Sequence, residues 1–375
     1  MAKKENTAPT NSKPRKPTPK KSFSMDDFKK KIGGEDVPDK PLEWIKCSTA
    51  LQKATGLPGF PVGYVSLARG FSNTGKSTAV SEAIVAAQKM GIVPVIIDTE
   101  NNLGKERLKA MGFDEDGDYL WINNDYLLNN FGKKQDINRN EAAIEDLAEA
   151  IKDLIFKQAN GDFPRNLLFA IDSIGTLDCI KTINAHEKNT SDNNMWNAGA
   201  YEKAFKYLLN NTIPNTRKVN REFTSTMVAV QKIWIDSMGA GVVKHKGGES
   251  FFFGCRLGYH FGGIAAHGTK IVTAENTLDG EKRTVAYGTD TKVTVFKNHI
   301  DGPLGGISLE GRIMSMPHGF IFAEDLDAYK KENIKYFRQI LKDDSLNAED
   351  IEDKIVRDKD AAFDVNEYVD GANEK

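Results

Sequence analysis

The feature that most constrains the fold is one nine-residue segment, Gly70-Phe71-Ser72-Asn73-Thr74-Gly75-Lys76-Ser77-Thr78. It fits the pattern G-x-x-x-x-G-K-[ST], in which backbone N–H groups cradle phosphates. An alternating apolar run, 63–68, precedes it, and an Ala-rich helical pattern, 78–90, follows it. This order of strand, loop and helix is the context that the pattern requires, because the helix N-terminus adds its positive dipole. The alternative is a glycine turn that binds nothing.

The residue types in this segment have chemical reasons. Gly70 and Gly75 permit backbone conformations and close approaches that a Cβ would block. Lys76 would reach the β- and γ-phosphate oxygens, and Ser77 would offer its hydroxyl to Mg²⁺. The segment, from Gly70 to Thr78, therefore predicts a site for a nucleoside triphosphate and magnesium.

Beyond this segment, expected strands alternate with expected helices. The strands are 93–98, 119–122, 166–173 and 227–231, and the helices are 104–112, 140–160 and 199–211. Continuous apolar runs are typical of strands covered on both faces. The alternation predicts an α/β fold with a doubly wound, mostly parallel sheet that binds ligands at the carboxyl ends of its strands.

The flanking regions differ from this core. Before it, the patterns predict helices over 24–33 and 44–56. After residue 250, the patterns predict a β-hairpin-rich part and one last helix. Its expected strands are 257–261, 270–274, 283–287 and 292–297, with turns at 279–280 and 287–290, and its helix is 325–342.

Charge is distributed unevenly although the net charge is only −2. Residues 1–24 carry seven basic residues and one acid, whereas residues 343–375 carry twelve acids and four bases. Both ends are expected to be solvated and mobile. The three cysteines are isolated in sequence, which fits a reducing cytoplasm. No run approaches the roughly 20 apolar residues of a membrane span, so no membrane partner is expected.

Three expected strands carry polar residues to one sheet edge. Asp172 closes the strand 166–173 and would hold Mg²⁺ through water. Glu100, just after the strand 93–98, could accept a proton from an attacking water. Gln231 ends the third strand and could hydrogen-bond a γ-phosphate. Each residue alone could also be a cap or turn former.

Two polar segments follow strand ends and face the same edge. The segment 184–197 contains Met195 and Trp196, and 232–249 contains Trp234, four glycines and the Lys244-His245-Lys246 triplet. Cationic and flat side chains are what a single nucleic-acid strand needs in order to bind. Long Gly-rich loops are often functional. The alternative is a pair of flexible surface loops with incidental tryptophans.

Several of these pieces together resemble the RecA family, and most closely its phage UvsX-type members. They are the entry 57–64 to the phosphate segment, Ile97-Asp98-Thr99-Glu100-Asn101, Ala170-Ile171-Asp172-Ser173, Val230-Gln231 and Val295-Phe296-Lys297-Asn298-His299. The resemblance covers roughly residues 44–315. It implies a RecA-like ATPase core over 57–318, an N-terminal polymerisation segment over 25–56, and a C-terminal helix with an acidic tail over 319–375. The remaining residues, 1–24, would be a disordered basic arm.

The resemblance implies an Mg²⁺-dependent, DNA-dependent ATPase that forms helical filaments on single-stranded DNA and pairs it with homologous duplex DNA. Lys297 would reach the ATP of a neighbouring subunit, and Arg107 would stack on the adenine. The residues implied to bind DNA are Met195, Trp196, Trp234, Lys244, Lys246, Gly247 and Gly248. A single-strand-binding protein and a loading mediator are implied partners. The alternatives are a hexameric helicase and a non-filamentous regulatory ATPase. A helicase would be expected to have an arginine finger, and Arg312 is a poor candidate for it.

Overall fold

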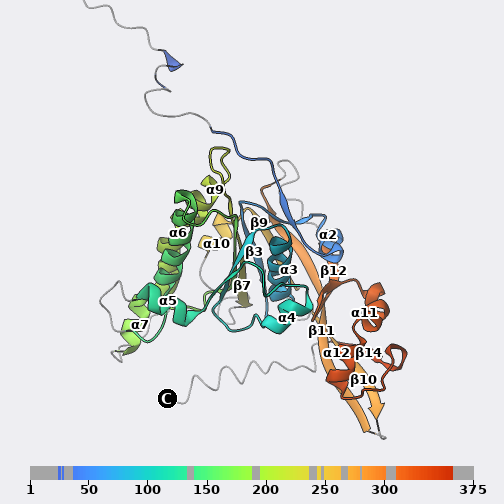
Figure 1. The fold of residues 1–375 in the computed structure, drawn as a ribbon. Helices are drawn as coiled ribbons and strands as arrows, with labels where there is room; N and C mark the ends of the chain where they lie inside the picture. The colour runs from blue at the N-terminus through green and yellow to red at the C-terminus, as the bar shows by residue number, and fades with distance from the viewer. Residues whose placement is uncertain are drawn as a thin grey trace, which may run out of the picture. The chain divides into compact units, whose positions relative to one another are not determined.

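The computed structural model of this chain describes residues 24–26, 28, 37–132, 139–187, 195–235, 243–245, 249–262, 269–278, 281–300 and 310–357 (Figure 1). The chain divides into two compact units, Met1–Pro38 and Asp39–Lys375. In the first unit, Phe28 N donates to the Ser24 carbonyl oxygen at 3.1 Å, as in a helix. The expected helix 24–33 therefore begins as predicted. Most of its remainder, and the expected arm 1–24 except for Ser24, lie outside the described residues.

The second unit is built on one large sheet, which has twelve strands in the part of the chain that the structure describes. Its central strands are parallel and lie in the order β9-β3-β7-β6-β4-β5. Their bounds are β3 Val65–Gly70, β4 Val93–Asp98, β5 Leu120–Ile122, β6 Leu167–Ile174, β7 Ser225–Ile235 and β9 Leu257–Phe261. This arrangement confirms an α/β fold with a mostly parallel sheet and places the carboxyl ends of these strands at one edge.

Helices cover both faces of the central strands. Helix α3 (Lys76–Lys89) packs into one buried cluster, and α6 (Ile144–Asn160) and α8 (Met195–Tyr207) pack into another. Figure 1 shows α3 and α6 on opposite sides of the sheet. Strand β4 supplies both clusters, because Ile96 points to the first and Ile97 to the second. The strand is apolar along its length because side chains on both of its faces are buried.

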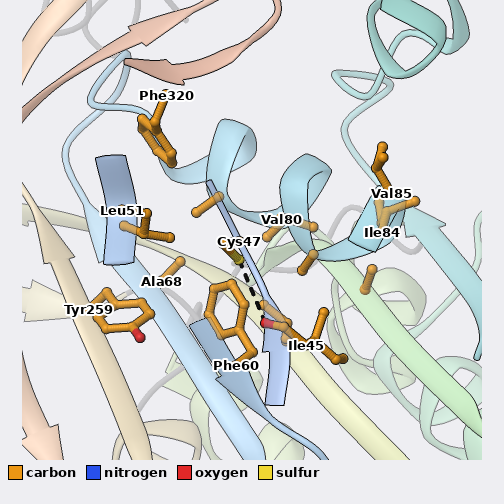
Figure 2. Close-up of a cluster of buried hydrophobic side chains, with 14 of the residues drawn as sticks. Ile45, Cys47, Leu51, Phe60, Ala68, Val80, Ile84, Val85, Tyr259 and Phe320 are labelled. Atoms are coloured by element: carbon orange, nitrogen blue, oxygen red, sulfur yellow. Dashed lines mark hydrogen bonds between the residues drawn. The ribbon is translucent and has the colours of Figure 1, made fainter. Parts of the chain in front are cut away.

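The start of the second unit differs from the expected helix 44–56. Residues Trp44–Lys46 form strand β1, which pairs antiparallel with β2 (Gly59–Pro61), and only Thr49–Thr55 form a helix, α2. Ser48 caps this helix by accepting from Leu51 N. Ile45 on β1 is fully buried beside Phe60 and the other core side chains of Figure 2. Burial of a β-branched residue in a paired strand therefore outweighed the helical pattern.

The other expected helices are largely present, with additions. Helices α3, α6 and α4 (Lys105–Ala110) confirm predictions, whereas α5 (Asn124–Asn130) and α7 (Ile180–Glu187) were not predicted. Helix α8 begins at residue 195 rather than 199 and continues through a π-helical turn into α9 (Ile213–Asn215). The expected loop 184–197 is therefore helical at both ends, and residues 188–194 lie outside the described residues.

The C-terminal part is antiparallel. Its elements are β10 Lys270–Leu278, β11 Glu281–Asn298, β12 Glu310–Met316, β13 Gly319–Ile321, α11 Leu326–Glu332, α12 Ile334–Leu341 and β14 Glu352–Arg357. The turn expected at 287–290 is wrong, because β11 runs through it as one strand with a bulge opposite β10. The expected helix 325–342 is broken at Asn333.

The acidic tail expected from residue 343 is also partly folded. Strand β14 pairs with β10, and Leu346 and Ile351 are buried in a third cluster with Phe337 and Leu341. The Tyr287 hydroxyl donates to Asp353 Oδ1 at 2.8 Å. These long-range contacts order residues 343–357 despite their acidic composition, so the prediction of a mobile tail is wrong there. Residues 358–375 lie outside the described residues.

Candidate nucleotide site and adjoining hairpin

The segment Gly70–Thr78 forms a tight loop between β3 and α3. A Cβ at Gly70 would clash with the carbonyl oxygen of Phe261 and lie 2.8 Å from Thr74 Oγ1. Gly75 has a φ of 96°, in the left-handed region that favours glycine. The Thr74 hydroxyl donates to the Phe71 carbonyl oxygen at 2.9 Å. The two glycines are therefore required by the backbone shape of the loop.

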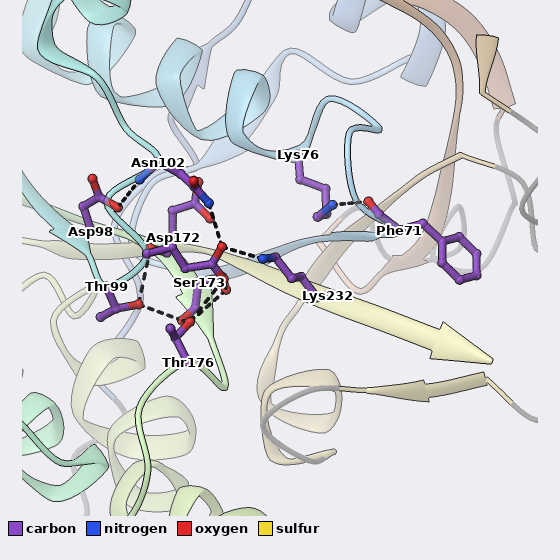
Figure 3. A network of polar contacts seen from close by, with 10 residues as sticks. Phe71, Lys76, Asp98, Thr99, Asn102, Asp172, Ser173, Thr176 and Lys232 are labelled. Atoms are coloured by element: carbon purple, nitrogen blue, oxygen red, sulfur yellow. Dashed lines mark hydrogen bonds and ion pairs between the residues drawn. The ribbon is translucent and has the colours of Figure 1, made fainter. Parts of the chain in front are cut away.

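Lys76 lies at the centre of this loop as a buried cation. Its Nζ donates to the carbonyl oxygen of Phe71 (Figure 3). Burial lowers the pKa of Lys76 to about 8, and the charges of Asp172 and Glu100 limit the shift. The ammonium is therefore still protonated at neutral pH, and an anion placed beside it would compensate its buried charge.

The strand register gathers further polar residues beside the loop. Asp98 of β4 is level with Asp172 of β6, and Gly70 of β3 is level with Lys232 of β7. Gln231 is fully buried and lies next to Lys232 in β7. The parallel arrangement thus brings four neighbouring strands together beside the loop. Gln231 does not end its strand as the sequence predicted, because β7 continues to Ile235.

Asp172 is a buried carboxylate. Burial raises its pKa to about 6, and a hydrogen bond from Ser77 opposes this rise. Within the described ranges, no hydrogen-bond partner reaches its Oδ2. Buried polar atoms are normally satisfied, so this oxygen fits a position that a ligand or cation completes.

The residues fit a magnesium ion that is held together with phosphates. Among the described residues, no cluster of three or more His, Cys, Asp or Glu could hold a metal ion. Magnesium commonly binds through one or two carboxylates plus substrate phosphate oxygens. The hydroxyl of Ser77 and the free oxygen of Asp172 are the donors that such a site needs.

Glu100 is held by donors on both carboxylate oxygens. Oε1 accepts from the hydroxyls of Ser173 and Thr176, the latter at 3.1 Å. Oε2 accepts from Lys232 Nζ at 2.5 Å and from Asn102 Nδ2 at 2.6 Å. Burial favours the neutral acid, but the hydrogen bonds from Lys232 and Ser173 outweigh burial, and the pKa of Glu100 lies below its usual value.

Sequence reasoning missed these partners of Glu100. Ser173 and Thr176 lie one and four positions after Asp172, and Lys232 directly follows Gln231. Their positions close to the predicted ends of strands were the only available signal. Asp98 was also missed: its two oxygens accept from the backbone N–H groups of Asn102 and Leu103, each at 3.0 Å. Asp98 thereby shapes the turn that carries Glu100.

Arg107 lies against the first turn of α3. Its Nη2 donates to Thr78 Oγ1 at 2.5 Å, and Thr78 Oγ1 lies 2.6 Å from Ser315 Oγ. Burial lowers the pKa of Arg107, and the charge of Asp172 opposes this effect. The structure therefore brings Arg107 to the phosphate loop.

Lys297 lies outside the cluster of Lys76, Asp172 and Glu100 in the described part of the chain. Its Nζ donates to the carbonyl oxygens of Phe252 at 2.7 Å and Phe253 at 3.0 Å, at the end of α10 (Ser250–Gly254). Burial lowers the pKa of Lys297.

The expected loop 232–249 begins as a β-hairpin. Strand β7 continues to Ile235 and pairs antiparallel with β8 (Val243–His245). The reason is the β-branched and aromatic composition of 233–235, which favours an extended chain. Trp234, whose exposed fraction is 44%, lies directly opposite exposed Lys244.

The remaining residues implied to bind DNA are only partly described. Met195 and Trp196 lie in the first turn of α8, and their side chains are outside the described set. Lys246, Gly247 and Gly248 lie outside the described residues altogether. Figure 3 shows strand β7 leading from the Lys232 contact toward the hairpin.

Comparisons with known proteins bear on this site. No family model matches the chain. Similarity is found to the protein RecA of Aquifex pyrophilus, with 33% identity over 104 residues, 26% of this chain and 30% of that protein. The protein RecA of Corynebacterium aurimucosum is 36% identical over 87 residues, 23% of this chain and 22% of that protein. The protein RecA of Thermotoga petrophila is 38% identical over 84 residues, 22% of this chain and 24% of that protein.

These matches support a relationship to the RecA family. The chain spans less than a third of the length of these curated RecA relatives. Across the described ranges, no helix has both the length and the apolar composition of a membrane span.

Proposed function

We propose that this protein is an ATP-dependent recombinase of the RecA type, similar to the phage UvsX-type members. It would polymerise on single-stranded DNA and pair that strand with homologous duplex DNA. The observation that carries the proposal is the meeting of Lys76, Asp172 and Glu100 beside the strand that becomes the β7–β8 hairpin. Partial similarity to RecA supports the same reading.

In this proposal the loop Gly70–Thr78 binds the phosphates of ATP through its backbone N–H groups and Lys76. Ser77 and Asp172 would hold Mg²⁺, which when bound neutralises charge on the phosphate oxygens. Glu100 accepts a proton from the attacking water, and its ionised state at neutral pH suits it to that role. Arg107, beside the first turn of α3, would contact the adenine.

The hairpin would bind DNA in response to the nucleotide. Gln231 would contact the γ-phosphate and order the segment that follows it, a recognised type of switch. Trp234 offers a flat surface for a base, and Lys244 offers a cation for a phosphate. The further DNA contacts would come from Met195, Trp196, Lys246, Gly247 and Gly248.

Self-association would complete the ATP site. Lys297 would reach the nucleotide bound by the adjacent subunit, with 25–56 as the polymerisation segment. A single-strand-binding protein and a loading mediator would be further partners. A helicase ring is a weaker candidate, because Arg312 donates to both carboxylate oxygens of Asp290, at 3.1 and 2.6 Å, within its own chain.

Electron microscopy with single-stranded DNA and a non-hydrolysable ATP analogue tests this proposal. A helical filament that requires both ligands is the expected result, together with DNA-stimulated ATP hydrolysis. A closed ring would favour the helicase instead. Particles that neither polymerise nor bind DNA would contradict the proposal and favour a regulatory ATPase. The variant Lys76→Ala should abolish both filaments and hydrolysis.

A further inference from the structure

Lys232 connects the hairpin to the candidate base. Its Nζ lies 2.5 Å from Glu100 Oε2, although the two residues are 132 positions apart in sequence. The side chain of Glu100 has an exposed fraction of only 9%, and that of Lys232 has 34%. The backbone of Lys232 is level with Gly70, the first residue of the phosphate loop. Its side chain therefore reaches from the strand beside the loop to Glu100.

The contacts of Glu100 fix the orientation of its carboxylate. Each oxygen has two donors, and the donors come from the turn after β4, from β6 and the turn after it, and from β7. Three of them, Asn102, Ser173 and Thr176, are neutral. Among the described residues, Lys232 is the one cation in direct contact with this carboxylate.

Other charges around Glu100 act from a greater distance. Lys76 on α3 attracts it, and Asp172 on β6 repels it. Lys232 also lies close enough to Lys76 to oppose its protonation. Removal of the Lys232 charge would leave Glu100 beside a like charge on Asp172, with only the more distant Lys76 to compensate it.

We propose that Lys232 is a positioning residue for ATP hydrolysis: it keeps Glu100 ionised and correctly oriented, and it links Glu100 to the β7–β8 hairpin. The inference rests on the proposed function. Because Lys232 belongs to the strand that forms the hairpin, a shift of that strand changes the Lys232–Glu100 separation. A longer separation weakens the ion pair. A movement of the hairpin therefore changes the orientation and the electrostatic environment of Glu100 directly.

This link is separate from the one proposed for Gln231. Gln231 would contact the γ-phosphate, whereas Lys232 contacts the carboxylate that activates water. The two residues are adjacent in an extended strand, so their side chains point to opposite faces of the sheet. A single movement of β7 would therefore act on the phosphate and on the base together.

Steady-state ATP hydrolysis by the full-length protein tests the proposal. Lys232→Met should lower kcat by roughly 10- to 100-fold, because a misplaced base loses about that much. The KM for ATP should change less than about twofold, since Lys76 and the loop still bind phosphates. Lys232→Arg keeps the charge and should recover most of kcat. Lys152→Met is the matched control, because Lys152 is 37% exposed and pairs with Glu149 at 2.8 Å away from the site.

The dependence on pH and on Glu100 gives the sharper readout. The acidic limb of the kcat profile should move upward in Lys232→Met by roughly 1–3 pH units, since Glu100 loses its opposite charge. In a Glu100→Gln background, adding Lys232→Met should change the residual rate less than about twofold. A full additional loss in that background would show that Lys232 does not act through Glu100 and would overturn the inference.

The outcomes separate the inference from the proposed function. Absence of hydrolysis by the wild-type protein would contradict the proposed function and the inference with it. Hydrolysis by the wild type with unchanged kcat in Lys232→Met would overturn only the inference. Thermal unfolding of each variant checks folding, and a Lys232→Met protein that unfolds at the wild-type temperature but loses kcat supports the positioning role.

Discussion

The guanidinium carbon of Arg69 lies 3.6 Å from the centroid of the Phe296 ring. Phe296 stacks on Phe252 with centroids 5.6 Å apart and planes at 7°, and Phe252 stacks on His245 at 5.7 Å. Arg69 immediately precedes Gly70, and His245 belongs to strand β8 of the hairpin. A stacked column of four side chains thus joins the entry of the phosphate loop to the hairpin.

Replacing Arg69 should loosen this hairpin. Lysine keeps the charge of Arg69 but loses the planar group that stacks on Phe296. A partly desolvated cation–π contact contributes about 0.5–2 kcal/mol. Arg69→Lys should therefore increase hydrogen exchange at Val243–His245, measured by mass spectrometry. Arg217→Lys is the control, since Arg217 stacks on Tyr64 at 3.8 Å; equal exchange in both variants would refute a structural role for the column.

Asp172→Asn should stabilise the nucleotide-free protein at pH 7. The folded pKa of Asp172, about 6, exceeds the ordinary value of 3.8. The folded state therefore binds more protons between these values, and the contribution of Asp172 to stability falls as pH rises from about 4 to 6. The gain from Asn at pH 7 is up to about 3 kcal/mol. Urea unfolding at pH 7 and 4.5 measures it.

The same variant should lose magnesium-dependent hydrolysis, because an amide is a poor replacement for the carboxylate at a magnesium site. The stability gain should shrink at pH 4.5, where Asp172 is already mostly protonated. A stability difference that is the same at both pH values would contradict the assignment of a buried, unsatisfied carboxylate.

Gln231→Ala should separate nucleotide binding from the response to DNA. Binding of ATP should persist, because Lys76 and the loop are unchanged. DNA-stimulated hydrolysis should be lost, because the residue proposed to sense the γ-phosphate is gone. Fluorescent nucleotide titration and ATPase rates with and without single-stranded DNA test both parts. An unchanged DNA-stimulated rate would count decisively against the proposed coupling.

Asp146→Ala should destabilise the protein by about 3–5 kcal/mol, because it leaves a buried guanidinium unpaired. Arg139 donates to both oxygens of Asp146 at 2.9 Å, and both side chains are fully buried. Lys157→Ala removes an exposed pair with Asp153 on the same helix and should cost about 0–1 kcal/mol. Chemical denaturation that gave equal losses for the two variants would contradict this contrast.

Local sequence patterns predicted those helices and strands whose buried residues can be recognised within a short stretch of sequence. The strand 93–98 was recognisable because all six of its residues are buried and most are β-branched. Helix α3 was recognisable because the loop before it fixes where it begins. The carboxylates Asp172 and Glu100 were selected as candidates for the same reason, since Asp172 lies near the end of one clear apolar strand and Glu100 follows another.

The features that the sequence did not predict depend on contacts between residues that are far apart in the chain. Trp44–Lys46 is a strand because Gly59–Pro61 returns beside it, which a helical periodicity over 44–56 did not reveal. Lys232 meets Glu100 only through the strand order of β4, β6 and β7, which follows from tertiary packing. The pairing of β7 with β8 was not predicted, because the segment 232–249 is rich in glycine and was therefore expected to be a loop.

The pairing of β14 with β10 has a practical consequence for deletion variants. A chain ended at Leu341, the natural choice for removing acidic charge, would strip the outer edge of β10 and take Leu346 and Ile351 from their buried places. Any defect in such a shortened protein would report lost folding rather than lost electrostatics. Deletions that retain the chain through Arg357 leave this edge covered and isolate the effect of the terminal carboxylates.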